Sequence, residues 1–250
     1  YPEPGFPIYE SMINYSGAKA VPMHLSDKNN FSFNVKEVLS LINDKTRLLI
    51  LNNPQNPTGG LIPKDQIDEL AIGLEQYPHV AIMSDEIYSR QIYDGNKMPS
   101  FFYYPKLYDR LIVLDGWSKT YAMTGWRLGW SVWPEQLIEL VTRMAINSYS
   151  CVSAANQVAA IAALNGPHDF LEDMMIKFNK RRKLIVEGLN SIDGIKCNNP
   201  GGAFYVFPNI SETGLTGAQF ADKCLYGAGV AIIPGTSFGK SANDFVRFSF

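Results

Sequence analysis

The hydrophobic positions along the chain fall into short continuous runs, each of which ends in polar or turn residues. Four runs rich in Val, Ile and Leu span residues 47–54, 80–86, 110–116 and 128–134. Continuous rather than alternating hydrophobicity is typical of strands that are covered on both faces, as in a mostly parallel sheet. The four runs therefore predict the strands of one central sheet.

Segments with the period of an amphipathic helix lie between and after these runs. Behind Pro63, apolar residues recur at Ile67, Leu70, Ala71 and Leu74, so that a helix connects the first two strands. Strand, helix and strand form the βαβ unit of an α/β fold. The same reasoning predicts further helices over 134–147, 154–165 and 170–192.

The last of these helices has an apolar side and a basic run. The run consists of Lys177, Lys180, Arg181, Arg182 and Lys183. Because the chain around it is nearly neutral, we expect the run to be a solvated face rather than a binding patch.

The pattern changes after the long helix to short strands separated by glycine and proline, with one helical stretch over 217–226. This change predicts a large domain over 1–175 and a second, smaller α+β domain over 176–250. The opening stretch YPEPGFPIY is predicted to be a loop. We expect a piece of a longer chain, with the large domain incomplete at its N-terminus and the small domain incomplete at its C-terminus.

Composition excludes several classes of function. The formal net charge is −2, with 46% hydrophobic and 18% charged residues, which gives no electrostatic case for nucleic acid or an anionic membrane. No apolar run approaches the ~20 residues of a membrane span. The three cysteines and three histidines are scattered, which predicts neither disulfides nor a metal site. We expect a cytoplasmic protein with small-molecule partners.

Polar residues follow three of the predicted strands, where an open α/β sheet binds its ligands. They lie in NNPQNPTGG (52–60), SDEIY (84–88) and GWSK (116–119). Taken singly, Asp85 is an ordinary helix cap, Asn56 a turn former and Lys119 an exposed cation. Taken together with Arg127, they match the needs of pyridoxal phosphate: a lysine for its aldehyde, a carboxylate for its pyridine nitrogen, donors for its ring hydroxyl and cations for its phosphate.

Five segments in order along the chain resemble the class I/II aminotransferases of the fold-type I pyridoxal-phosphate enzymes, in particular aspartate aminotransferases. They are NPQNPTG (53–59), SDEIY (84–88), SKTYAMTGWRLGW (118–130), PGGAFYVF (200–207) and VRFSF (246–250). The resemblance implies the type I fold of pyridoxal-phosphate-dependent transferases, an α/β fold with a mostly parallel sheet flanked by helices and a second smaller domain.

The resemblance also implies a role for seven residues. Lys119 matches the Schiff-base lysine and Asp85 the partner of the pyridinium nitrogen. Asn56 and Tyr88 match the residues that hydrogen-bond the ring hydroxyl, and Asn56 also borders the substrate. The phosphate is matched by Ser118 and Arg127, and the α-carboxylate of the substrate by Arg247. The family's glycine-rich turn and the aromatic residue that stacks on the cofactor are expected before Tyr1.

The activity implied is ping-pong transfer of an amino group between an L-amino acid and a 2-oxo acid, aspartate-like with 2-oxoglutarate, by a homodimer. Two alternatives stay open. The same residues serve β-lyases and related eliminating enzymes, because the cofactor breaks the bonds. A similar domain also occurs as the cofactor-binding part of some transcriptional regulators.

Overall fold

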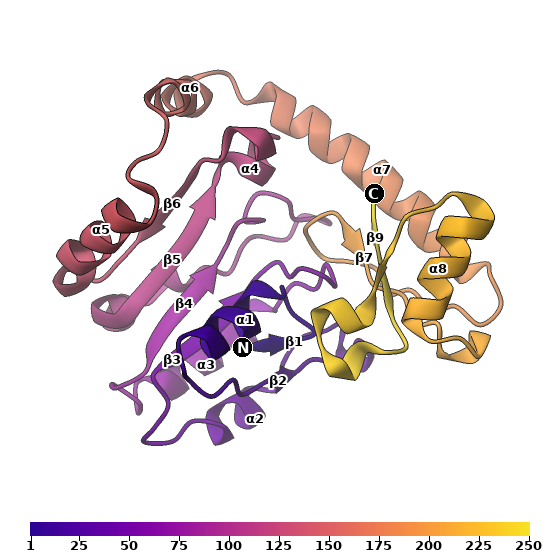
Figure 1. The fold of residues 1–250 in the computed structure, drawn as a ribbon, viewed down its shortest axis with the longest axis horizontal. Coiled ribbons are helices and arrows are strands. Elements are labelled where there is room, and N and C mark those ends of the chain that lie inside the picture. Colours follow the sequence, from indigo (N-terminus) through magenta and orange to yellow (C-terminus); the bar gives the residue numbers. More distant parts are fainter.

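A computed structural model describes residues 1–250 and is built around a four-stranded sheet (Figure 1). The strands are β3 (Leu48–Asn52), β4 (Ala81–Asp85), β5 (Leu111–Gly116) and β6 (Gly129–Val132), in the spatial order β3-β4-β5-β6. The first three are mutually parallel, whereas β6 pairs antiparallel with β5. All four predicted strands are confirmed, and with them the α/β fold class.

One face of this sheet carries the main hydrophobic core. It is covered by α2 (Val35–Ser40) and α3 (Lys64–Leu74). Ile67, Leu70 and Leu74 of α3 are at most 1% exposed and pack with strand residues in a cluster of 17 buried side chains. The helical spacing of these residues thus places one stripe of α3 against the sheet.

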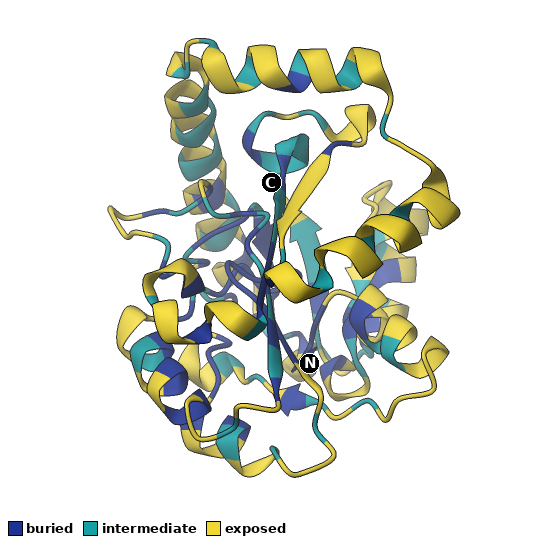
Figure 2. Ribbon diagram, turned by 90° about the vertical axis from the view of Figure 1, so that its left-hand side faces the viewer, coloured by how far each residue is buried: buried dark blue, intermediate teal, exposed yellow.

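Three helices follow β6: α5 (Glu135–Tyr149), α6 (Ala154–Asn165) and α7 (Asp169–Asn190). They match the predicted helices to within a few residues at each end. Figure 1 shows α7 running from α6, at one side of the molecule, to the small sheet at the other. No helix combines the length and apolar character that crossing a membrane requires. In Figure 2 the buried residues concentrate in the central strands and loops, and α5 has no buried residue at all.

The C-terminal part forms a separate small sheet. Its strands are β7 (Tyr205–Val206), β8 (Ile233–Pro234) and β9 (Val246–Ser249), in the antiparallel order β7-β9-β8, and they pack with α8 (Gly217–Ala228). Thr216 and Gln219 cap α8 by reciprocal side-chain hydrogen bonds. The predicted division at 175/176 falls inside α7, and the division itself stays a prediction.

The prediction of a loop for the opening stretch (1–9) holds for residues 4–7 and is wrong on either side of them. Residues 2–3 form β1 (Pro2–Glu3), which pairs with β2 (Met23–His24), and α1 spans Ile8–Tyr15. Pro7 immediately precedes α1, a position where its fixed φ suits a helix start. Long-range contacts also order this stretch, because Gly5 N–H donates to the Phe238 carbonyl at 2.8 Å and Ser241 N–H to the Glu3 carboxylate at 3.0 Å.

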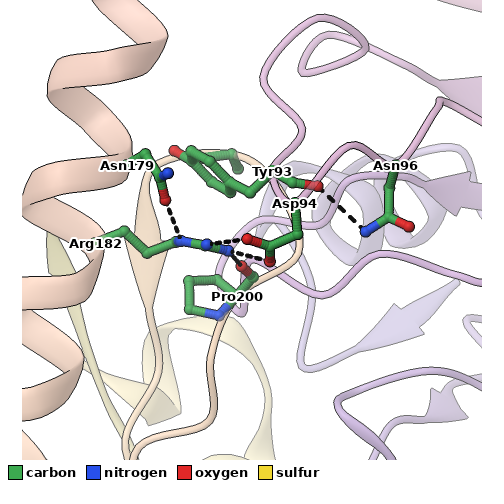
Figure 3. A network of polar contacts seen from close by, with 7 residues as sticks. Tyr93, Asp94, Asn96, Asn179, Arg182 and Pro200 are labelled. Carbon is green, nitrogen blue, oxygen red and sulfur yellow. Dashed lines mark hydrogen bonds and ion pairs between the residues drawn. The ribbon is translucent and has the colours of Figure 1, made fainter.

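The basic run of α7 is solvated except at one position. Lys177, Lys180, Arg181 and Lys183 are exposed. Arg182 is only 1% exposed, which corrects the prediction for this residue. Its guanidinium donates to both Asp94 oxygens, at 2.9 and 2.5 Å, and to the Pro200 carbonyl at 2.8 Å (Figure 3). Arg182 can be buried because the two oxygens of the Asp94 carboxylate accept the hydrogen bonds that water would otherwise accept.

Candidate active site

A cavity of about 450 Å³ opens beyond the carboxyl ends of the three parallel strands. The register brings these ends level, because Asn52 of β3 pairs with Asp85 of β4, and Asp85 with Leu114 of β5. The cavity wall contains all seven predicted site residues: Asn56, Asp85, Tyr88, Ser118, Lys119, Arg127 and Arg247. Residues that are up to 191 positions apart in the sequence therefore share one hollow.

Asp85 is a mostly buried carboxylate at the end of β4. Its Oδ2 accepts a hydrogen bond from the Tyr9 hydroxyl at 2.6 Å, and its Oδ1 accepts one from the Ile87 N–H at 3.3 Å. Burial raises the pKa of Asp85, while the bond from Tyr9, the bond from Ile87 and the charge of Lys119 oppose this shift. Tyr9 is the largest of the contacts that favour the ionised carboxylate, but burial outweighs them and leaves the pKa of Asp85 raised.

Lys119 lies on the short helix α4 (Trp117–Thr120), directly after β5. The turn requires glycine at position 116, because a Cβ there would lie 2.8 Å from the Leu128 carbonyl oxygen and 2.9 Å from Gly129 Cα. The Lys119 ammonium is half-buried and forms no ion pair. Burial, followed by the charges of Arg247 and Arg127, lowers the pKa of Lys119. Such an amine is available as a nucleophile or base at lower pH than an ordinary lysine.

Arg247 reaches the same cavity from β9 of the small sheet. Its Nη1 donates to Asn56 Oδ1 at 2.8 Å, and its Nε is buried with no hydrogen-bond partner. No carboxylate of the chain pairs with it. The buried Nε–H without an acceptor is an energetic cost, and the remaining donors of this half-buried guanidinium suit a carboxylate.

Tyr88, in the loop after β4, lies next to Lys119. The Lys119 ammonium is 5.9 Å from the centre of the Tyr88 ring. The Tyr88 hydroxyl lies 3.0 Å from the hydroxyl of Tyr205. Burial is the main cause that raises the pKa of both tyrosines, so both hydroxyls are protonated at neutral pH.

The cavity wall also contains Ser118, Arg127 and Asp115. Arg127 has a left-handed backbone with φ of 53° and donates from Nη1 to the Thr124 carbonyl at 2.9 Å. Its remaining donors are unpaired and exposed, which suits an anion such as a phosphate. Asp115 is held by the Ser89 hydroxyl at 3.0 Å and the Gly116 N–H at 2.6 Å.

Sequence reasoning missed Phe6, Tyr9 and Tyr205, all of which line the cavity. Phe6 and Tyr9 lie in the stretch that was predicted as a loop, and their rings contact edge-to-face at a centroid distance of 6.0 Å. An aromatic wall of the cavity is therefore present within the chain, although the stacking residue was expected before Tyr1. The available signals were the aromatic residues Phe6 and Tyr9 on either side of Pro7 and the place of Tyr205 in the segment PGGAFYVF (200–207).

A second hollow, of about 650 Å³, lies between β6, α5 and α6. It is larger than the cavity at the strand ends, but 13 of its 18 lining residues are hydrophobic. It contains none of the charged residues described above. The size of a cavity therefore does not identify the site. The charged residues that converge on the smaller cavity, at the strand ends, identify it as the candidate site.

The model of the family described as aminotransferase class I and II matches residues 1–250. The chain belongs to this family. The aspartate aminotransferase of Pyrococcus abyssi is 37% identical over 251 residues, covering 100% of the chain and 64% of that relative. Aromatic-amino-acid aminotransferase 2 of Thermococcus litoralis is 35% identical, with the same coverage of 100% and 64%.

Solved structures of this family are similar throughout the chain. The aspartate aminotransferase of Rhizobium meliloti superimposes with a TM-score of 0.92 at 34% identity, covering 99% of this chain and 64% of that one. The aromatic aminotransferase of Pyrococcus horikoshii superimposes with a TM-score of 0.94 at 36% identity, covering 99% and 66%. The fold is thus that of an aminotransferase, and the chain spans about 64% of the length of its relatives.

Proposed function

We propose that the protein of which these residues are part is an aminotransferase that moves an amino group between an L-amino acid and a 2-oxo acid, with pyridoxal phosphate as its cofactor. One observation carries the proposal: an unpaired lysine, a buried carboxylate and an unpaired arginine line a single cavity at the strand ends. Family membership supports the same reaction class.

The residues of the cavity fit pyridoxal phosphate. When bound, this cofactor supplies an aldehyde that receives the amino group and a ring that accepts electrons from the substrate. Lys119 would hold the aldehyde carbon and Asp85 the protonated pyridine nitrogen. Asn56 and Tyr88 would donate to the ring hydroxyl, and Ser118 and Arg127 would bind the phosphate. The unpaired donors of Arg127 and the lowered pKa of Lys119 support this fit.

The residues of the chain have distinct tasks in the reaction. Arg247 binds the α-carboxylate of the substrate with its free donors and so orients the bonds at Cα. Lys119, as a neutral amine, would take the proton from Cα of the substrate and deliver it to the aldehyde carbon of the cofactor. Asp85, when ionised and held by Tyr9, would keep the pyridine nitrogen protonated. Because both substrates use the same cavity in turn, the kinetics are expected to be ping-pong.

Aspartate with 2-oxoglutarate is the proposed substrate pair. Several relatives of this chain are named aspartate aminotransferases, whereas two others are named aromatic aminotransferases. A panel of amino-acid donors with the full-length protein, followed by 2-oxo acid formation, tests the choice. Faster turnover of aromatic donors than of aspartate would contradict it.

Replacement of Lys119 tests the function itself. In the full-length protein, Lys119→Ala is expected to lower transamination roughly 10²–10⁴-fold, because the proton carrier is lost. Borohydride reduction of the wild-type protein with cofactor, followed by peptide mass spectrometry, is expected to label Lys119. The exposed Lys45→Ala serves as control and is expected to keep full activity. Label on another residue, or normal rates for Lys119→Ala, would overturn the proposal.

The two alternative functions, a β-lyase and a transcriptional regulator, predict different reaction products. A β-lyase would release ammonia and a 2-oxo acid from one substrate, whereas the proposed enzyme forms a new amino acid from two. A regulator would bind the cofactor without turnover.

We also propose that the full-length protein is a homodimer. Light scattering of the full-length protein tests this proposal.

A further inference from the structure

Tyr205 lies between the two ends of the candidate site. It belongs to β7, is 5% exposed and lines the cavity together with Lys119 and Arg247. None of the roles described above requires it. Two of its contacts, one through the ring and one through the hydroxyl, reach different groups of the site.

The Tyr205 ring contacts the guanidinium of Arg247. The Arg247 Cζ is 4.5 Å from the centre of the Tyr205 ring and 4.8 Å from that of Phe238. Apart from these rings, the guanidinium is held in the chain by Asn56 alone. Aromatic faces attract and orient a cation without occupying its N–H donors. The rings therefore fix the Arg247 side chain and leave donors free for a carboxylate.

The Tyr205 hydroxyl contacts Tyr88 at the other end. The two hydroxyl oxygens are 3.0 Å apart, and both groups are buried and protonated. Either hydroxyl can be the donor of this bond. When Tyr205 donates to Tyr88, the proton of Tyr88 stays free to point into the cavity, and the pair then directs a donor toward the place where the ring hydroxyl of the cofactor is expected.

The main chain around Tyr205 is fixed by contacts outside the cavity. The Ala203 carbonyl accepts from the Tyr93 hydroxyl at 2.6 Å, and the Ala203 N–H donates to the Gln91 carbonyl at 2.8 Å. The Gly202 N–H donates to the Gly59 carbonyl at 3.0 Å. None of these contacts uses the Tyr205 side chain, so its replacement removes groups from the site while the backbone keeps its anchors.

We propose that Tyr205 is a positioning residue with two separable actions: its ring orients Arg247 toward the substrate carboxylate, and its hydroxyl orients Tyr88 toward the ring oxygen of the cofactor. The inference rests on the proposed function, because that proposal assigns both the substrate carboxylate and the ring oxygen of the cofactor. It adds a residue through which the substrate end and the cofactor end of the cavity are held in one geometry.

Two substitutions in the full-length protein separate the actions. Tyr205→Phe keeps the ring and is expected to leave the dissociation constant of maleate, a dicarboxylate probe, within about twofold. It is expected to move the pH midpoint of the visible absorbance of the cofactor-loaded protein upward, because a loosely held Tyr88 stabilises the negative ring oxygen less. Tyr205→Met removes the ring face and is expected to weaken maleate binding to the cofactor-free protein about fivefold to tenfold.

The exposed tyrosine of α8, Tyr226, provides the matched control. It is 84% exposed and remote from the cavity lining, so Tyr226→Phe is expected to change neither readout. Tyr205→Phe retains the buried volume, and circular dichroism checks that each variant folds. An unmoved absorbance midpoint in Tyr205→Phe, or unchanged maleate affinity in Tyr205→Met, overturns the inference. A wild-type protein with neither cofactor absorbance nor transamination would instead overturn the proposed function.

Discussion

At the scale of single residues, Lys119 shows that the candidate site lowers the stability of the folded protein. Its ammonium is half-buried near two arginines and has no ion-pair partner. The folded protein therefore disfavours the charged form of Lys119, and its pKa lies below the ordinary value of 10.5. Reactivity toward an aldehyde and reduced stability have the same cause.

The pH dependence of stability follows from this shift. Below the lowered folded pKa, protonated Lys119 destabilises the fold, and the cost fades as the pH rises from there toward 10.5. We expect Lys119→Met to raise the melting temperature of the cofactor-free protein at pH 7, with a smaller gain at higher pH. Thermal unfolding at a series of pH values measures this. The exposed Lys183→Met is the control, and an equal gain from it would contradict the explanation.

Tyr9 is expected to determine how readily Asp85 ionises. Loss of a hydrogen bond to a charged group costs about 1.5–3 kcal/mol, which corresponds to one to two pKa units. Tyr9→Phe should therefore raise the pKa of Asp85 further and weaken cofactor binding. Carbon-13 NMR of aspartate-labelled, cofactor-free protein reports the titration. Tyr15→Phe changes the same helix at an 85% exposed position and should leave the titration unchanged.

The sequence predicted some site residues better than others for a physical reason. Asp85 is the last residue of β4, and Lys119 comes shortly after the end of β5. Because parallel strand ends meet at one edge of a sheet, local patterns were sufficient to predict both residues. Tyr9 and Tyr205 do not follow the parallel strands. They reach the cavity because the two ends of the chain fold back onto it. A local sequence pattern does not predict such long-range folding.

At the scale of elements, Arg182 holds α7 against the loop between β4 and β5 and against the segment that precedes β7. It connects Asp94, Pro200 and Asn179, and its guanidinium lies 4.3 Å from the centre of the Tyr93 ring (Figure 3). The helix was predicted from its period, but periodicity did not distinguish the one buried cation from its exposed neighbours. That distinction depends on a carboxylate 88 positions away.

We expect Arg182→Met to destabilise the protein by about 1–3 kcal/mol, because it leaves the buried Pro200 carbonyl without its donor, whereas the half-exposed Asp94 carboxylate can be solvated by water. Urea unfolding of the full-length, cofactor-free protein measures the change. Arg181→Met is the matched control, since Arg181 is the same residue type at the adjacent, exposed position. A similar loss for both variants would show that the contacts of Arg182 contribute nothing specific.

At the scale of the whole molecule, the face formed by β6, α5 and α6 is unusually apolar. Ile146, Tyr149 and Ile161, which line the hollow of about 650 Å³, are between 57% and 63% exposed. Contiguous apolar surface of this kind is rare on stable monomers. The chain spans about 64% of the length of its relatives. The parts of a full-length protein outside residues 1–250 are therefore candidates to cover this face.

We expect residues 1–250 alone to bind a hydrophobic dye and to self-associate more than the full-length protein, because this face would then contact water. Dye fluorescence and light scattering measure both effects. Ile161→Glu is expected to reduce them in the 250-residue chain. Ile72→Glu on α3 is the matched control, since Ile72 is 66% exposed but lies outside the hollow. Equal effects of the two substitutions would remove this face as the cause.

The bond between Asn56 and Arg247 has a consequence for biosynthesis. These residues are 191 positions apart, so a chain leaving the ribosome presents Lys119 long before the strand that carries Arg247. Until that strand emerges, Lys119 lacks one of the neighbouring cations that lower its pKa. The amine of the nascent polypeptide is therefore expected to be more fully protonated, and less reactive toward aldehydes, before β9 has been made than after it.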